Sequence, residues 1–340
     1  MTGRRFLLAV LLLAVAAALC VAVAPLRDAV FPWTVSRVLE TTLLTWPPWG
    51  FRVTRVAHAA PVDVPVRPGR ALKAELFRAA GPCRGRMLFV HGSIPKGRAF
   101  SPYRFLAREL AGAGYDVLLP DIGGYGESRL KPDQVPEFGR DVAAAARFLT
   151  ALDGAAAGDG LLVLAHSLGA SMALRAVVHH GLRPARLVLW DPPISGELGD
   201  AETRAAPAVG RFRSELQVEG GGRLAVDDAV LVRYCAGLDP IDLLRALPAP
   251  PQIPTLVALG SLIGSHGPLV QALGLDTGWM TILDMTGVDH FLNMVSLGKE
   301  GDWLLYRPGN CGLLLDSLHQ WLKRLDTAAA SSPASPAPRG

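Results

Sequence analysis

A serine at the junction of an apolar run and a helical pattern is the first residue of this sequence that could do chemistry. The stretch LLVLAHSLGAS, residues 161–171, is apolar up to His166 and Ser167 and then continues with helical periodicity. Ala165 and Gly169 are small enough to let a strand and a helix approach closely around the serine. Such a turn pushes the Ser167 hydroxyl out above a sheet, where it can act as a nucleophile. The alternative is that Ser167 only caps the helix.

Two earlier stretches carry further features of a site for acyl transfer. FVHGS, residues 89–93, ends an apolar run with a small loop, and PDIGGYGES, residues 120–128, follows the next run. A tetrahedral oxyanion needs backbone N–H groups aimed at it. We expect the N–H of Leu168, directly after the serine, and the N–H of Ser93 to form this oxyanion hole.

These three stretches, taken together and in this order, resemble the α/β-hydrolase family, and within it the capped branch of esterases, lipases and peptidases. The resemblance covers about residues 51–325. Ala165 stands where the family pattern G-x-S-x-G has its first glycine, and a methyl group is a small departure. The resemblance implies a serine hydrolase whose nucleophile, acid and histidine follow one another in that order along the chain.

The histidine implied by this order is His290. It lies in TILDMTGVDHFLNM, after the last predicted strand and before the last predicted helix, and we expect it to be the general base for Ser167. His166 adjoins the nucleophile, but we expect its side chain to point elsewhere on the tight turn. His91 belongs to the loop that carries Ser93, and we interpret it as structural.

The acid is harder to assign. The family most often carries it after the strand read here as residues 254–260, but this chain has Ile263 at the expected position and no carboxylate before Asp276. A second arrangement used in the family places the acid one strand earlier, where ARLVLWD ends on Asp191. We therefore expect Asp191 to hold His290, although the motif WDPP is also a common structural strand ending. The alternatives, in order, are Asp276 and then Asp284 or Asp289.

The rest of the sequence predicts the scaffold that brings these residues together. Short, continuous apolar runs indicate strands buried on both faces, as in a parallel sheet, at residues 86–92, 115–121, 161–167, 185–191, 254–260 and 279–285. Helical patterns follow at residues 103–114, 135–152, 169–182 and 310–325. Residues 51–59 and 71–79 alternate apolar with polar, so we predict an antiparallel pair joined by a Pro/Gly-rich turn. The fold class is thus a mostly parallel, doubly covered α/β sheet of the α/β-hydrolase type.

A long insertion interrupts this alternation between Asp191 and Pro254. It contains helical candidates near residues 227–234 and 240–246. Insertions of this length above a sheet are typically caps, and the carboxyl ends of the strands are where ligands bind. We expect a helical cap at about residues 194–250 within a hydrolase domain of residues 51–325.

The two ends of the chain differ in composition from this domain. Arg4 and Arg5 precede an uncharged apolar run, residues 6–24, which predicts a signal-anchor or transmembrane helix within residues 1–25. A cleaved signal peptide is the alternative, since small residues stand at 16–18 and 22–24. Residues 26–50 would be a tryptophan-containing juxtamembrane segment, and residues 326–340, rich in Ala, Ser and Pro, a disordered tail. Positive charge before the apolar run predicts an extracytoplasmic domain, single-pass or secreted.

Charge and cysteine content argue against other classes of protein. The net charge of +4 is spread along the chain without a basic block, so we expect no nucleic-acid partner. The four cysteines form no CxxC pair, so neither a metal site nor a cofactor is expected. We interpret Cys83, Cys235 and Cys311 as free thiols. The alternative is a disulfide between Cys83 and Cys311.

The expected function is hydrolysis of a carboxylic ester through an acyl-enzyme. The predicted anchor and apolar cap make a lipid or acylglycerol ester a substrate to consider, besides small-molecule esters. The same constellation also serves peptidases, amidases and acyltransferases. A non-catalytic hydrolase-fold protein that binds a ligand at the membrane is the alternative from another class, because the usual position of the acid lacks a carboxylate.

Overall fold

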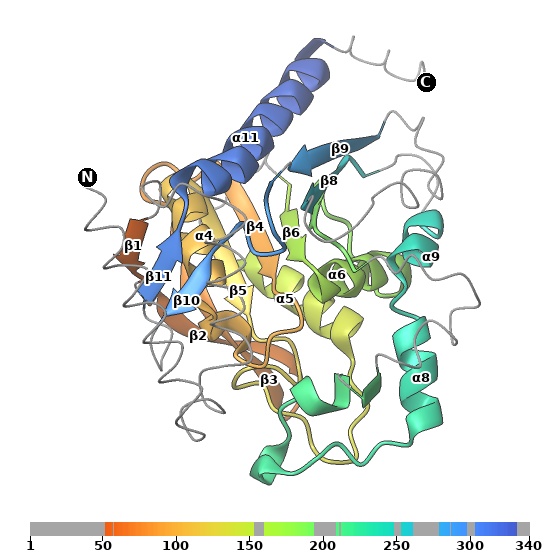
Figure 1. Cartoon of the computed structure of the whole chain (residues 1–340). Helices are drawn as coiled ribbons and strands as arrows, with labels where there is room; N and C mark the ends of the chain where they lie inside the picture. The colour runs from red at the N-terminus through yellow and green to blue at the C-terminus, as the bar shows by residue number, and fades with distance from the viewer. Residues whose placement is uncertain are drawn as a thin grey trace, which may run out of the picture.

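The core of the fold is a mostly parallel β-sheet (Figure 1). The computed structural model describes residues 52–56, 58–152, 160–193, 209–210, 212–247, 253–260, 279–285, 287–297 and 303–331. Within these residues the sheet has the strand order β2-β3-β5-β4-β6-β7-β8-β9. The strands are β2 Ala60–Arg67, β3 Arg70–Phe77, β4 Gly85–Val90, β5 Tyr115–Pro120, β6 Leu162–His166, β7 Arg186–Trp190, β8 Thr255–Gly260 and β9 Met280–Met285. In this described sheet β3 alone runs opposite to all the other strands, so the predicted α/β class is confirmed.

The alternation of side chains along each strand divides the hydrophobic core into two layers. In β4, Leu88 and Val90 belong to the cluster on one face, and Met87 and Phe89 belong to the cluster on the other. All four side chains are fully buried. Successive residues of a strand point to opposite faces, so a continuous apolar sequence is what a strand covered on both faces requires.

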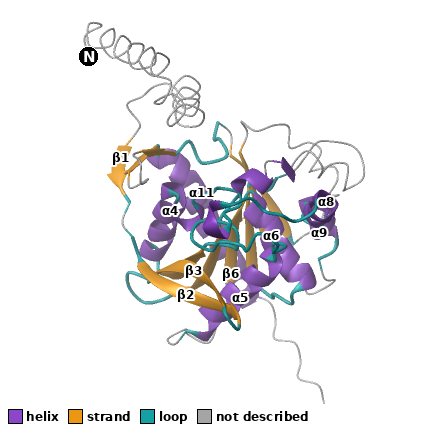
Figure 2. Ribbon diagram, turned by 90° about the horizontal axis from the view of Figure 1, so that it is seen from below, coloured by secondary structure: helices purple, strands orange, loops and turns teal. Residues whose placement is uncertain are grey.

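Helices cover both faces of the sheet (Figure 2). The helices α4 Ser101–Gly112 and α11 Pro308–Ser331 contribute to the core cluster of one face, and α5 Phe138–Ala151 and α6 Leu168–His179 contribute to the other. The insertion between β7 and β8 contains α8 Asp228–Ala236 and α9 Pro240–Arg245 (Figure 1). The last of these packs against α6. Single turns of 3-10 helix, η3 and η4, lie at Gly97–Ala99 and Glu219–Gly221.

The first antiparallel pair differs from the prediction. We expected residues 51–59 to pair with residues 71–79, but the partner of β3 is β2, which begins at Ala60. The sequence of β2 contains Pro61 and Pro65, which suggested a turn. Because β2 is the edge strand of the sheet, one of its sides needs no hydrogen-bonding partner, and proline is tolerated there. The turn itself is shorter and includes Gly69, whose φ of +75° favours glycine.

A second, smaller sheet was not predicted. It has the order β1-β11-β10, with β1 at Arg52–Arg55, β11 at Trp303–Tyr306 and β10 at Val295–Leu297. Both pairings are antiparallel and join the first described strand to the segment that follows His290. β1 lies within residues 51–59, whose alternation was correctly read as a strand, but its partner β11 is far away in the sequence. β10 and β11 are too short to show a clear period-2 pattern.

The last helix extends beyond the predicted domain end. α11 continues to Ser331, so the tail predicted to begin at residue 326 is helical in its first part. The stretch after Asp326 contains three alanines, and alanine has the highest helix propensity of all residues. Composition alone therefore misplaced this boundary.

The predicted N-terminal membrane segment, residues 1–25, and the juxtamembrane residues 26–50 lie outside the described residues. Among the helices of the described part, none is both long and apolar enough to cross a bilayer. The membrane segment therefore stays a prediction.

A buried histidine fixes the loop that follows β4. His91 is fully buried. Its Nδ1–H donates to the carbonyl oxygen of Gly92 (2.7 Å), and its Nε2 accepts from the N–H of Ile122 (3.0 Å). Because a backbone N–H can only donate, Nε2 carries no proton. Burial lowers the pKa of His91 from 6.5 to about 4, so a neutral ring joins the loop after β4 to the loop after β5.

Removal of the buried carboxylate of Asp141 should destabilise the fold. Asp141, on α5, is fully buried and accepts two hydrogen bonds from the Arg70 guanidinium (2.6 and 2.7 Å) and one from the Gly123 N–H (3.1 Å). Asp141→Ala removes these three bonds and leaves Arg70 only its longer ion pair with Glu137 (3.7 Å), so the free energy of unfolding in urea should fall by about 3 kcal/mol. Asp63→Ala is the control: it breaks the exposed Lys73 ion pair and should cost less than about 1 kcal/mol. Equal effects would contradict this assignment.

The neutral His91 ring should make stability depend on pH. Its pKa is lower in the folded protein than the ordinary 6.5, so the unfolded chain binds a proton that the folded chain does not. The wild type should therefore lose stability as the pH falls from 6.5 towards 4, by up to about 1.4 kcal/mol per pH unit. His91→Gln, compared with the wild type by urea denaturation across this range, should remove that component. A pH profile of the same slope in both proteins would contradict it.

Candidate active site

Ser167 lies at a strained turn between β6 and α6. Its φ of 52° and ψ of −128° are unusual for a residue with a side chain. Ser167 occupies the N-cap position of α6, but its hydroxyl makes no capping hydrogen bond. The alternative interpretation of this serine as a helix cap is therefore wrong. Its backbone N–H still donates to the Trp190 carbonyl oxygen (2.9 Å), which holds the turn against the end of β7.

Small residues make this turn possible. A Cβ atom on Gly169 would lie 2.5 Å from the carbonyl oxygen of Val90, at the end of β4. A Cβ atom on Gly92 would lie 2.9 Å from the Cβ of Ser167 itself. Any side chain at either position would push α6 or the loop after β4 away from the serine. The loop that carries Ser93 thus lies directly against the Ser167 turn.

Asp191 and His290 are in direct contact. The distance between Asp191 Oδ2 and His290 Nδ1 is 2.6 Å. The Asp191 side chain is buried, at 5 % exposure, whereas His290 is 19 % exposed. An ionised carboxylate only accepts hydrogen bonds, so the proton lies on Nδ1. Nε2 of the neutral ring is then left with a lone pair.

The end of β7 places Asp191 beside the serine turn. His166 and Trp190 are register partners in the parallel pair β6-β7, so the residues that follow them, Ser167 and Asp191, are neighbours at the same sheet edge. Asp191 also has a positive φ, 47°. Its N–H still donates to the carbonyl oxygen of Ala258 in β8 (2.7 Å), as in a regular pairing of β7 with β8. Two strained residues therefore stand side by side, each directly after a strand.

The other predicted acids within the described residues are Asp289 and Asp284, and both lie in other settings. Asp289 accepts hydrogen bonds from the N–H groups of Phe291 (2.8 Å) and Asn293 (2.6 Å), so its carboxylate closes the local turn. Asp284 is exposed on the edge strand β9. Asp276 and Ile263 lie outside the described residues.

The two backbone N–H groups that we expect in the oxyanion hole make no hydrogen bond to another described residue. They belong to Leu168, the first residue of α6, and to Ser93, in the loop after β4. The N–H of Gly92, between His91 and Ser93, is used differently: it donates to the Tyr103 hydroxyl (3.0 Å). The N–H groups of Leu168 and Ser93 are thus left for a ligand, whereas that of Gly92 is not.

The insertion between β7 and β8 reaches the same loop. Glu215, in a helical segment at residues 212–215, accepts a hydrogen bond from the Ser93 hydroxyl. The Tyr125 hydroxyl lies 3.1 Å from the same Ser93 Oγ, and burial raises the pKa of Tyr125, so it stays a neutral phenol. Glu215 could not be predicted from the sequence, because nothing in an irregular insertion indicates which carboxylate turns inward.

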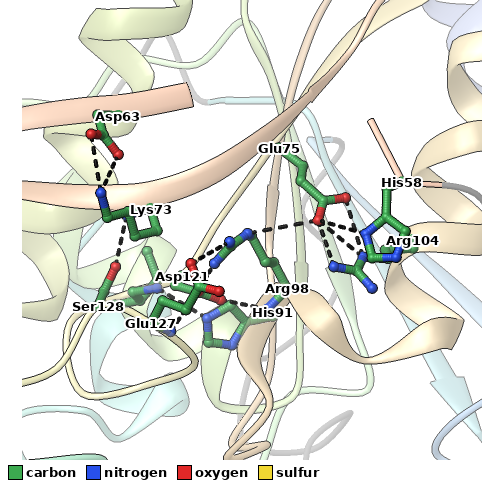
Figure 3. Close-up of polar contacts among 11 residues, drawn as sticks. His58, Asp63, Lys73, Glu75, His91, Arg98, Arg104, Asp121, Glu127 and Ser128 are labelled. Carbon is green, nitrogen blue, oxygen red and sulfur yellow. Dashed lines mark hydrogen bonds and ion pairs between the residues drawn. The ribbon is translucent and has the colours of Figure 1, made fainter. Parts of the chain in front are cut away.

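A network of buried charged side chains holds Arg98, which follows the loop after β4, against the loop after β5 (Figure 3). The Arg98 guanidinium binds the carboxylate of Asp121, and Arg98 N–H donates to the same carboxylate (2.6 Å). The N–H of Glu127 also donates to Asp121 (2.8 Å). On the other side of Arg98, Glu75 pairs with Arg104 (2.6 Å). These bonds hold the loops after β4 and β5 together.

Within the described residues, no group of three or more His, Cys, Asp or Glu side chains is arranged to hold a metal ion. Cys83, Cys235 and Cys311 are free thiols, so the conceivable Cys83–Cys311 disulfide is not formed.

Parts of this chain are similar to known proteins. Residues 81–235 match a family model described as serine aminopeptidase, S33. A curated relative, N-formylmaleamate deformylase of Pseudomonas putida, is 38 % identical over 92 residues, which is 27 % of this chain. The match spans only about a third of that relative, 32 % of its length.

Solved structures share the fold at low sequence identity. A complex of DcsB with its substrate analogue has a TM-score of 0.55 and 13 % identity, covering 78 % of this chain and 99 % of the other. A thermophilic esterase from Thermogutta terrifontis, with malate bound, has a TM-score of 0.50 and 17 % identity, covering 78 % and 99 %. The strand order, the strained serine turn and these structural similarities lead to one conclusion: the described part of the chain has the α/β-hydrolase fold.

Proposed function

We propose that this protein is a serine hydrolase that cleaves a carboxylic ester through a Ser167-His290-Asp191 triad. The observation that carries the proposal is the 2.6 Å contact between Asp191 and His290 at the sheet edge where Ser167 forms its strained turn. A buried carboxylate that orients a partly exposed imidazole is the arrangement a general base needs. The histidine then has one free nitrogen, Nε2, with which to accept a proton.

The proposed reaction begins with attack of Ser167 Oγ on the substrate carbonyl carbon. His290 Nε2 takes the serine proton as the carbon–oxygen bond forms, and Asp191 stabilises the imidazolium without being protonated itself. The tetrahedral intermediate collapses, the leaving alcohol takes the proton from His290, and an acyl-enzyme remains. Water, deprotonated by His290, attacks the acyl-enzyme, releases the acid and returns the proton to Ser167.

The developing negative charge on the carbonyl oxygen needs donors that are in place before the reaction. The N–H groups of Leu168 and Ser93, which make no hydrogen bond to another described residue, support this role. Leu168 is the first residue of α6, so the positive end of the helix dipole adds to the stabilisation. Loss of one such donor costs about 10²- to 10³-fold in kcat.

Amide hydrolysis is the second candidate, and a specific observation favours it. The curated relative is a deformylase, and the matching family model is described as an aminopeptidase. The two candidates share the same triad and differ in the leaving group, an alcohol or an amine. Parallel assays with p-nitrophenyl esters and with N-acyl and N-formyl amides of matched acyl groups would separate them.

A lipid or acylglycerol ester at a membrane is the more specific form of the proposal. It rests on the apolar run at residues 6–24, which would hold the domain close to its substrate on the extracytoplasmic side. A series of p-nitrophenyl esters with increasing acyl chain length tests it. Activity that rises with chain length supports a lipid ester, and activity confined to short chains contradicts it.

Ser167→Ala should abolish labelling by a fluorophosphonate probe and lower ester turnover by about 10⁴-fold or more. The serine hydroxyl is the group that both reactions consume. Ser171→Ala is the matched control, since Ser171 lies buried on the same helix and should keep full labelling. No labelling of the folded wild type would favour the non-catalytic alternative.

Asp191→Asn should lower kcat by about 10³- to 10⁴-fold, because an amide favours the wrong tautomer of His290. Asp284→Asn, on the exposed edge strand, should leave p-nitrophenyl ester turnover unchanged. Steady-state kinetics of both variants measures this difference. If Asp191→Asn retained wild-type turnover, a different acid would have to serve the triad.

A further inference from the structure

The geometry points to His166 as a positioning residue that holds the main chain of His290 through a buried chain of hydrogen bonds beginning at Gly92 and Tyr103. This inference rests on the proposed roles of Ser167 and His290. It assigns a function to the residue directly before the nucleophile, which the triad itself does not use.

Three short contacts form the chain. The Gly92 N–H donates to the Tyr103 hydroxyl oxygen (3.0 Å). The same hydroxyl lies 2.9 Å from His166 Nδ1. On the other side of the ring, His166 Nε2 lies 2.8 Å from the carbonyl oxygen of His290. A continuous path therefore links the loop after β4 to the residue proposed as the general base.

The chemistry of the groups fixes the direction of each bond. A carbonyl oxygen only accepts, so His166 Nε2 must carry the proton that it donates to His290. A neutral imidazole then has an acceptor at Nδ1, and the Tyr103 hydroxyl donates to it. Burial raises the pKa of Tyr103, so its proton is retained. The Tyr103 oxygen in turn accepts the Gly92 N–H, and every group in the chain is satisfied.

The surroundings keep the His166 ring in one orientation. His166 and Tyr103 are both fully buried. The ring centroids of Trp190, His290 and Phe291 lie 4.0, 4.4 and 5.1 Å from that of His166. A ring packed this closely cannot flip without displacing its neighbours, so the tautomer and the orientation support each other.

The consequence for catalysis is that His290 is held at two points. Asp191 holds its side chain through Nδ1 (2.6 Å), and His166 holds its backbone through the carbonyl oxygen (2.8 Å). His166 directly precedes Ser167 in the chain, so the residue that holds the main chain of the general base is covalently joined to the nucleophile. The chain also begins at Gly92, next to the Ser93 N–H, so one network sets the positions of nucleophile, base and oxyanion donor.

Tyr103→Phe tests this chain with the smallest possible change. It removes only the hydroxyl and so leaves His166 free to adopt the other tautomer. We expect kcat for a p-nitrophenyl ester to fall about 10-fold with KM changed less than about twofold, as for a misplaced catalytic group. An unchanged kcat in a variant that is folded by circular dichroism would overturn the inference.

Tyr234→Phe is the matched control for the stability cost of the change. Like the Tyr103 hydroxyl, the Tyr234 hydroxyl accepts a hydrogen bond from a backbone N–H, that of Phe138 (3.0 Å). Tyr234, however, lies on α8 and is not part of the chain that leads to His290. It should lower the unfolding temperature about as much as Tyr103→Phe and leave kcat unchanged. If both variants lost kcat in proportion to their loss of stability, His166 would have only a structural role.

Substitution of His166 itself separates hydrogen bonding from packing. In His166→Gln the side-chain amide can still donate to the His290 carbonyl oxygen, whereas His166→Leu fills similar space without a donor. We expect His166→Gln to retain about 10-fold more kcat than His166→Leu. Equal loss in both variants would overturn the inference, and if the leucine variant does not fold, the glutamine and Tyr103→Phe variants still decide it.

The tautomer can be measured without any activity assay. In a sample labelled with ¹⁵N-histidine, the His166 resonances, assigned by their loss in His166→Gln, should show a protonated Nε2 and an unprotonated Nδ1. A protonated Nδ1 would overturn the chain. Absence of fluorophosphonate labelling in the wild type would overturn the proposed function and this inference together, whereas labelling with unchanged kcat in Tyr103→Phe overturns the inference alone.

Discussion

The candidate site depends on two backbone turns that are unfavourable by themselves. Ser167 and Asp191 both adopt a positive φ directly after neighbouring parallel strands. Each such residue costs about 1 to 3 kcal/mol, and the sheet offsets that cost because both N–H groups keep their ladder hydrogen bonds. The register of β6 and β7 therefore decides that a hydroxyl and a carboxylate emerge side by side. The remaining elements add the imidazole and the unpaired N–H groups around this pair.

Much of the scaffold could be predicted from the sequence, because a strand buried on both faces leaves a continuous apolar run such as that of β4 or β6. The edge of the sheet was harder to predict. β2 was missed because it contains Pro61 and Pro65. Proline is tolerated in an edge strand, but in a sequence whose strand order is unknown it predicts a turn. In the small sheet, β1 pairs with β11 across about 250 positions, as in Arg52 with Tyr306, and no local pattern encodes such a pairing.

Some residues of the candidate site have a local signal in the sequence, and others have none. Ser167 and its small neighbours follow a local rule, so the sequence indicated them directly. The contact of Asp191 with His290 depends on how the loop after β9 turns back over the sheet, which no local pattern reveals. The links from Tyr103 and Glu215 depend entirely on packing. A tyrosine in an amphipathic helix such as α4 gives no sign of the bond that its hydroxyl makes.

The small sheet also protects an edge of the molecule. In the order β1-β11-β10, the strand β11 is central and has both of its sides paired. If β1 were absent, β11 would present a row of unpaired N–H and C=O groups next to the side chain of Trp303, which is 48 % exposed. Exposed edges of this kind recruit strands from other chains. A version of the protein shortened to begin after Val56 would therefore be prone to self-association, whatever the state of its catalytic residues.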